Sequence, residues 1–243
     1  MMSKKLGVVF YHKNILDIYS PLWVKKSVES MLNQKGPQFK IYEVNYGGDN
    51  YSVLEGTQHN READFYSKEF DNHAQAMNFI LDRAFEDGCD FVFNTNLDDY
   101  YSGDRIQKQL EVLSQGYDLV SSNFCYIEGD GHDDQILKYL TVSEGKIKDD
   151  FEKNSNSIAH PSVVYSKNFW AHNRYVDSEI PEEDFLLWKR ALENGFSFKI
   201  CPEYLLFYRL HKSQITGNNE EGANILRSKK INQPLPPGPG LIR

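Results

Sequence analysis

The stretch DFVFNTNLDD (residues 90–99) places a cluster of polar oxygens directly after a short apolar run. The apolar run is typical of a strand that is buried on both faces of a sheet. Asn96, Asp98 and Asp99 then lie just beyond the end of that strand. Open α/β sheets bind their ligands outside the carboxyl ends of the strands. The stretch therefore predicts both a buried strand and the edge of the sheet at which a ligand binds.

Strands and helices alternate on both sides of this stretch. Short apolar or alternating runs predict strands, and apolar residues that recur every three to four positions predict helices. The expected strands are residues 6–11, 39–45, 90–93 and 117–121; the expected helices begin at Pro21, contain the apolar face of residues 77–85, and span residues 103–115. This alternation is typical of βαβ units and predicts a mainly parallel sheet.

After residue 125 the pattern is less regular. We predict a loop at residues 129–134, a β-hairpin over 138–148, a helix over 181–193, and strands at 196–201 and 204–210. Residues 49–70 are polar and receive no assignment. The Pro- and Gly-rich residues 234–240 are incompatible with a helix or a central strand. The second half is therefore expected to be a mixed α/β arrangement.

The chain has 243 residues, of which 40% are hydrophobic and 14% aromatic, so one domain can bury a core without disulfides or metal ions. The net charge of −8 and the lack of a long basic run argue against binding to a nucleic-acid backbone. Cys89, Cys125 and Cys201 are too far apart for a disulfide framework or a zinc motif. No apolar stretch is long enough for a signal peptide or a transmembrane segment, so we expect a soluble, cytoplasmic protein.

The ligand at the predicted sheet edge is not indicated by a glycine-rich phosphate loop. There is no GxGxxG motif after the first predicted strand and no GxxxxGK[ST] motif, which disfavours dinucleotide and P-loop sites. The carboxylates of Asp98 and Asp99 repel one another unless a positive group joins them, and a divalent cation with oxygen ligands would do so. The alternative is that one of them caps the helix expected at residues 103–115. The pattern alone favours neither.

Two later segments also carry charged side chains. Glu183 and Asp184 fall in the first turn of a predicted helix, where acidic residues commonly complement the helix dipole. Arg209 and His211 leave an apolar strand on the same side, as expected of either a surface strand or a site for anions or a metal. Taken alone, neither segment indicates a function.

Taken together and in order, these segments resemble a family 2 glycosyltransferase of the GT-A fold. The resemblance covers about residues 5–215 and is carried by residues 30–34, 45–49, Asn78, residues 96–99, the Glu183-Asp184 pair and residues 208–211. It implies a single GT-A domain over residues 1–216, with a mostly parallel central sheet flanked by helices. Its Rossmann-like nucleotide-sugar half is expected at about residues 1–100 and a mixed acceptor half at 101–216, followed by a tail over residues 217–243.

For the reaction, the resemblance implies a metal-dependent glycosyltransferase that moves a hexose from a UDP-sugar to a hydroxyl of a glycan or glycoprotein, with inversion at the anomeric carbon. Asp98 would be a ligand of Mn²⁺ or Mg²⁺, His211 would complete the site, and Asp99 would support it. Asp184 would be the catalytic base that takes the proton of the acceptor hydroxyl, with Glu183 as its neighbour. One small family member with this order of motifs glucosylates galactosyl-hydroxylysine in collagen, which is one candidate acceptor.

The resemblance also assigns binding residues. For the nucleotide-sugar they are Tyr11, Asn45, Asn78, Asn96, Asp98 and Arg209, and for the acceptor they are Asn123, His160 and Trp188. Asn96 replaces the first aspartate of the metal motif and Met77 replaces an arginine, which motivates an alternative: a catalytically weak or inactive member that binds a nucleotide-sugar or glycan. A sugar nucleotidyltransferase is disfavoured because no Gly-rich, basic loop follows the first strand. The aromatic pairs at 100–101 and 169–170 are expected in the core rather than in a platform for the acceptor.

Overall fold

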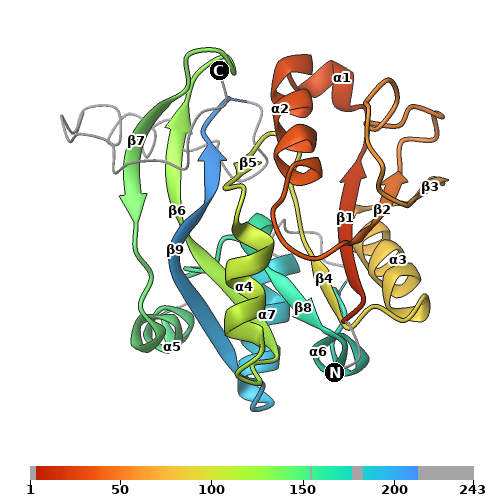
Figure 1. Ribbon diagram of the computed structural model, residues 1–243. Coiled ribbons are helices and arrows are strands. Elements are labelled where there is room, and N and C mark those ends of the chain that lie inside the picture. Colours follow the sequence, from red (N-terminus) through yellow and green to blue (C-terminus); the bar gives the residue numbers. More distant parts are fainter. Residues whose placement is uncertain (1–3, 154, 177–182, 213–243) are drawn as a thin grey trace.

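A curled, mixed β-sheet forms the centre of the protein, and helices pack on both of its faces (Figure 1). The computed structural model describes residues 4–153, 155–176 and 183–212. Its strands are β1 (Leu6–His12), β2 (Lys40–Asn45), β3 (Ala63–Ser67), β4 (Phe91–Phe93), β5 (Tyr100–Tyr101), β6 (Leu119–Glu128), β7 (Gln135–Leu140), β8 (Val164–Ser166) and β9 (Phe198–Arg209). Its helices are α1 (Ile15–Ile18), α2 (Pro21–Leu32), α3 (His73–Glu86), α4 (Arg105–Leu113), α5 (Glu144–Glu152), α6 (Lys167–His172) and α7 (Glu183–Glu193), with a 3-10 turn at His160–Ser162.

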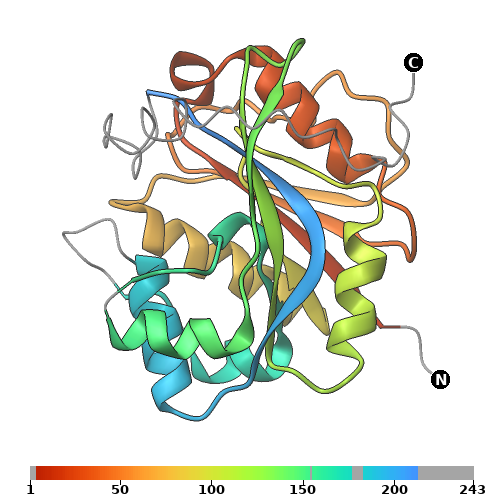
Figure 2. The same ribbon diagram turned by 90° about the vertical axis from the view of Figure 1, so that its left-hand side faces the viewer.

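The first half of the sheet is parallel throughout. β1 pairs with β2 on one edge and with β4 on the other, and β3 extends the sheet beyond β2. α3 packs against β1 and β2, and α2 and α4 lie on the opposite face of the sheet (Figure 2). The predicted parallel arrangement is confirmed, and the carboxyl ends of β1, β2 and β4 meet at a common edge.

The second half of the sheet is mixed, as predicted. β8 lies antiparallel between β4 and β6, and β6 pairs in parallel with β9. β7 pairs antiparallel with the end of β6, and β5 pairs antiparallel with β9. Although β5 follows β4 closely along the chain, it lies at the far end of the strand order. The sheet therefore curls back toward the turn at residues 94–99.

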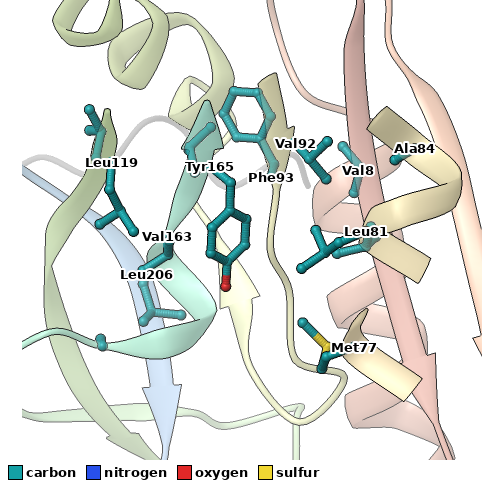
Figure 3. Close-up of a cluster of buried hydrophobic side chains, with 14 of the residues drawn as sticks. Val8, Met77, Leu81, Ala84, Val92, Phe93, Leu119, Val163, Tyr165 and Leu206 are labelled. Atoms are coloured by element: carbon teal, nitrogen blue, oxygen red, sulfur yellow. The ribbon is translucent and has the colours of Figure 1, made fainter. Parts of the chain in front are cut away.

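The core joins α3 to the strands of both halves (Figure 3). Met77, Leu81 and Ala84 recur at helical spacing along α3, so they lie on one side of that helix. They pack beside Val8 of β1 and Val92 of β4, and all five residues are 0% exposed. Burial of each large apolar side chain contributes roughly 1.5–3 kcal/mol, so this interface stabilises the sheet edge on which the site is built.

The β-hairpin predicted over residues 138–148 is wrong. β7 pairs with β6 instead, and the residues that follow it form α5. Ile147 and Phe151 are four positions apart and are only 3% and 4% exposed, so this segment presents one apolar side to the core. Gly145, which suggested a turn between strands, lies in the first turn of the helix.

Other boundaries also differ from the predictions. The strands expected at residues 196–201 and 204–210 are one strand, β9, which passes through Pro202 where its pairing with β6 shifts register. β3 lies in the unassigned residues 49–70, and neither β8 nor α6 was predicted. The expected helix over 181–193 is observed as α7; residues 181–182 and 217–243 lie outside the described residues. In none of the described ranges is a helix long and apolar enough to cross a membrane.

Candidate active site

An open cavity of about 750 Å³ lies at the common carboxyl edge of the parallel strands. Its wall combines the end of β1, the start of α3, the turn after β4, parts of β6, β7 and α5, and the start of α7. The predicted site residues that line it are Tyr11, Asn96, Asp98, His160, Glu183 and Asp184. Its volume falls within the range of small-molecule sites, about 300–1,000 Å³. The fold thus brings residues from both ends of the chain into one cavity.

Asp98 presents a carboxylate oxygen that no described residue pairs with. The residue lines the cavity and is 5% exposed. Asp98 Oδ2 lies 3.0 Å from His211 Nε2, whereas Asp98 Oδ1 is buried and has no hydrogen-bond partner among the described residues. The imidazole of His211 packs against Tyr19 and Trp23, at ring-centroid distances of 5.4 and 5.0 Å. An unpaired buried carboxylate oxygen is costly, so this position suits a cationic ligand.

The donor set fits a divalent cation that takes further ligands from a substrate. Mg²⁺ is usually held by one or two carboxylates together with phosphate oxygens and water. Among the residues that the structure describes, no group of three or more His, Cys, Asp or Glu side chains could hold a metal ion by itself. Because Mg²⁺ usually takes phosphate oxygens and water besides one or two carboxylates, Asp98 and His211 fit a cation that is completed by a ligand. The capping alternative is wrong, because the N-cap residue of α4 is Asp104.

Asp99 and Arg209 brace the Asp98 turn from behind the cavity wall. Asp99 Oδ1 accepts the backbone N–H of Arg209 at 2.8 Å, and Arg209 Nε donates to the carbonyl of Asp98 at 2.9 Å. The guanidinium also pairs with Asp134, with Nη1 and Oδ1 2.5 Å apart and side chains 1% and 3% exposed. Burial, and secondly the charge of Asp98, raise the pKa of Asp99 well above its usual range. The charge of Arg209 is thus paired with the buried carboxylate of Asp134. Neither Asp99 nor Arg209 lines the cavity.

Asn96, at the first position of the expected metal motif, is held by neighbouring hydroxyls. The hydroxyl of Tyr11 donates to Asn96 Oδ1, and the N–H of Asn96 donates to the hydroxyl of Tyr101 at 2.6 Å. Ser27 Oγ donates to the carbonyl of Asn96 at 2.8 Å. These bonds fix the start of the turn, and they place Tyr11 and Asn96 side by side in the cavity wall.

Glu183 and Asp184 begin α7 on another part of the wall. Asp184 Oδ1 accepts the N–H of Phe185 at 2.6 Å, and Oδ2 accepts a hydrogen bond from Asn156 Nδ2 at 3.0 Å. Burial raises the pKa of Asp184 and lowers that of His73, whose Nε2 lies 3.8 Å from Glu183 Oε1. A carboxylate whose pKa is raised at a cavity wall has the properties of a general base.

The remaining predicted residues are engaged within the fold and lie outside the cavity wall. They are Asn45, Asn78, Asn123 and Trp188. Asn45 Oδ1 accepts the N–H of Gly47 at 3.0 Å, within the turn after β2. Asn78 forms two hydrogen bonds of 2.9 Å with the backbone of Tyr175. Asn123 donates to a backbone carbonyl of β9 at 2.8 Å. Trp188 is 0% exposed. Their side chains support the walls of the site.

His160 lines the cavity with its ring already bonded. Its Nε2 lies 2.6 Å from the hydroxyl of Tyr175, and burial lowers the pKa of His160 to about 3, so the ring is neutral at pH 7. Several lining residues were not predicted from the sequence, among them Tyr46, His73 and Asn156. The position of His73 at the start of a helix could have been predicted, because it follows Asn72, a residue type that favours the helix N-cap. Tyr46 and Asn156 lie in loops, where no periodic pattern identifies them.

Residues 13–180 match the family model described as glycosyl transferase family 2, and the chain belongs to this family of glycosyltransferases. It is 26% identical over 196 residues to the O-antigen biosynthesis glycosyltransferase WbnJ of Escherichia coli, covering 78% of this chain and 75% of that protein. It is also 26% identical over 155 residues to the amylovoran biosynthesis glycosyltransferase AmsE of Erwinia amylovora, covering 64% of this chain and 56% of that protein. The chain thus spans between about half and three quarters of these relatives.

Solved structures share the fold at low sequence identity. S. aureus TarS 1–349 in complex with UDP-GlcNAc superposes with a TM-score of 0.63 at 14% identity, covering 96% of this chain and 68% of that chain. The mannosyltransferase PcManGT from Pyrobaculum calidifontis, in complex with GDP-Man and Mn²⁺, gives a TM-score of 0.63 at 12% identity, covering 94% of this chain and 62% of that chain. The fold of this chain is therefore that of GT-A glycosyltransferases.

Proposed function

We propose that this protein is a metal-dependent, inverting glycosyltransferase that moves a hexose from a UDP-sugar to a hydroxyl of a glycan or glycoprotein. One observation carries the proposal: Asp98 and Asp184 line the same cavity. Asp98 has a buried carboxylate oxygen with no partner among the described residues, and burial raises the pKa of Asp184. A cation ligand and a base are the two groups that such a transfer needs.

Asp98 and His211 are the residues that would hold Mn²⁺ or Mg²⁺. When bound, the cation supplies Lewis-acid stabilisation of the negative charge on the leaving diphosphate. Asp99 and Arg209 keep Asp98 in position through the hydrogen bonds behind the turn. Tyr11 and Asn96 line the adjoining wall, where they would contact the nucleotide-sugar.

Asp184 would take the proton of the acceptor hydroxyl. Its Oδ2 accepts a hydrogen bond from Asn156, which holds the carboxylate at the cavity wall. Because burial raises its pKa, Asp184 is a stronger base than an exposed aspartate. Attack of the hydroxyl from the side opposite the leaving diphosphate gives inversion at the anomeric carbon.

The alternative is a family member that binds a nucleotide-sugar without turnover. It is favoured by Asn96, which removes a carboxylate from the first position of the metal motif and whose amide oxygen accepts a hydrogen bond from Tyr11. The pairing of Asp98 with His211 and the environment of Asp184 favour the active enzyme.

Nucleotide release from a panel of UDP-, GDP- and dTDP-sugars tests the proposal, with Mn²⁺ or with a chelator present. We expect release from a UDP-sugar with Mn²⁺, and loss of release with Asp98→Ala or chelator. Asp184→Asn should strongly lower release, and its matched control is Glu193→Gln, which removes an exposed carboxylate at the far end of α7. Nucleotide binding without release from any donor, with and without glycan acceptors, would favour the binding protein. Preference for a GDP- or dTDP-sugar would contradict the assignment of the nucleotide.

A further inference from the structure

We infer that the acceptor is a carbohydrate whose pyranose ring packs on an aromatic surface formed by Phe124 and Tyr126 of β6 and Tyr208 of β9, here called the aromatic platform. The inference rests on the proposed function, since it concerns the acceptor side of the same reaction. All three rings line the cavity that also contains Asp98 and Asp184.

The alternation of side chains along β-strands places these rings on one face of the sheet. Phe124 and Tyr126 are two residues apart on β6, and Tyr126 pairs with Tyr208 on the neighbouring β9. On the other side of β6, Phe124 pairs with Leu140 of β7, which also lines the cavity. β7, β6 and β9 lie side by side in the left half of Figure 1. The aromatic platform and Leu140 therefore form a surface across three adjacent strands.

The three rings are held in place by one another. Tyr126 packs edge-to-face against Phe124 at a centroid distance of 5.4 Å and against Tyr208 at 5.6 Å, with interplanar angles of 87° and 82°. Such contacts are favourable for aromatic pairs. Because the rings are already packed against one another and backed by the sheet, a ligand loses less binding free energy to ordering them.

The aromatic platform adjoins the residues of the proposed reaction. Tyr208 directly precedes Arg209, whose N–H binds Asp99 behind the Asp98 turn. At the end of β7 the chain continues from Leu140 through α5 to Asn156, which donates to Asp184. The aromatic platform, Asp98 and the bonded pair Asn156–Asp184 therefore belong to the wall of one cavity.

The chemistry of the surrounding wall fits a sugar ring. A pyranose has an apolar face of C–H groups, which packs on aromatic rings, and a rim of hydroxyls, which needs hydrogen-bond partners. Polar side chains that line the same cavity include Thr141 and the pair Lys146–Asp150, whose charged atoms lie 3.8 Å apart. A serine or threonine hydroxyl on a peptide has no such flat apolar face. The platform is also the better-placed aromatic surface, since Phe169 and Trp170 are buried in the core at 0% and 1% exposed.

Saturation-transfer difference NMR tests the aromatic platform. The probes are the methyl glycosides of β-glucose, β-galactose, α-mannose and β-N-acetylglucosamine, with UDP and Mn²⁺ present. We expect saturation of ring C–H protons for at least one probe, and about tenfold weaker binding of it by Tyr126→Ala, which loses the ring surface. Tyr126→Phe should bind nearly as well as wild type, because stacking needs the ring and not the hydroxyl. If Tyr126→Ala does not fold, Tyr126→Leu replaces it with the same expectation.

Tyr139→Ala is the matched control. Tyr139 lies on β7, pairs with Cys125 and packs against Tyr204, so it lies on the opposite face from the platform. Loss of binding in this control equal to that in Tyr126→Ala, or no saturation of any probe by wild type, would overturn the platform. Calorimetry with UDP on the same samples tests the proposed function separately. UDP binding without glycoside binding overturns the platform alone, whereas glycoside binding without UDP binding supports the platform and contradicts a UDP-sugar donor.

Discussion

We expect Asp134→Asn to destabilise the protein and to loosen the turn that carries Asp98. Asp134 lies between β6 and β7, and its carboxylate contacts Arg209 Nη1 at 2.5 Å and Nη2 at 3.0 Å. Lys26 Nζ lies 2.6 Å from Asp134 Oδ2. Since Arg209 Nε donates to the carbonyl of Asp98, loss of the carboxylate charge removes the ion pair that helps to fix the guanidinium on which the turn depends.

Two observations set the size of this effect. Asp134 and Arg209 have side chains that are 3% and 1% exposed. Removal of one partner of such a buried pair costs about 3–5 kcal/mol, because the other charge is left uncompensated. Burial raises the pKa of Asp134, but hydrogen bonds from Arg209 and Lys26 outweigh it and bring that pKa to about 2. This shift corresponds to about 2–3 kcal/mol, so we expect a loss of about 3 kcal/mol.

Thermal unfolding at pH 7 measures this loss, with a decrease in Tm of about 6–12 °C expected for a domain of this size. The lowered pKa means that the ion pair stabilises the protein above about pH 4 and stops doing so as the pH falls toward 2. The difference between wild type and variant should therefore narrow in acid. Asp149→Asn, at an exposed position on α5, makes the same charge change and should leave Tm nearly unaltered. Equal Tm values for Asp134→Asn and this control would refute the reasoning.

Asp184→Asn should lower the rate of sugar transfer by about 10²–10⁴-fold while nucleotide binding persists, and an unchanged rate would contradict its role as the base. Because burial raises the pKa of Asp184, kcat/KM should begin to fall at a pH above the usual aspartate value of about 3.9; a profile that is flat down to pH 4 would argue against this. Leu81→Ala should cost about 2–5 kcal/mol in urea unfolding, since Leu81 is 0% exposed, whereas Leu16→Ala, at a residue 51% exposed, serves as the control. Gly48→Ala should destabilise by about 1–2 kcal/mol, because Gly48 has a φ of +86° and a Cβ there meets the side chain of Glu69; a variant as stable as wild type would show that the loop adjusts.

The parts of the fold that could be predicted are those with local signals. The apolar runs of β1, β2 and β4 and the helical face of α3 identify themselves by length and periodicity. α5 was missed because Gly145 is a local turn signal, whereas Phe151 is buried by distant residues, including Phe185 at a centroid distance of 5.2 Å. β3 was missed because it alternates between exposed and partly exposed residues and so lacks an apolar run.

The site was predictable to a similar extent. Its carboxylates could be located because a strand end and a helix start expose them, as at Asp98 and Asp184. The pairing of Arg209 with Asp134 could not be predicted. Nothing in the neighbouring sequence distinguishes an arginine that faces a phosphate from one that faces a buried aspartate 75 residues away. The same holds for Asn78, whose amide bonds to the backbone of Tyr175.

The amino-acid sequence by itself determined the parallel half of the sheet and the order of the polar segments, because period and strand ends are properties of neighbouring residues. It also determined, through the order of its motifs, the family to which the chain belongs. Only the tertiary structure decided which polar groups remain available at the cavity wall. Asp98 Oδ1 has no partner among the described residues, whereas Arg209 and Asn78 are engaged within the fold. The physical reason is that desolvation and hydrogen bonding depend on residues brought together from distant parts of the chain.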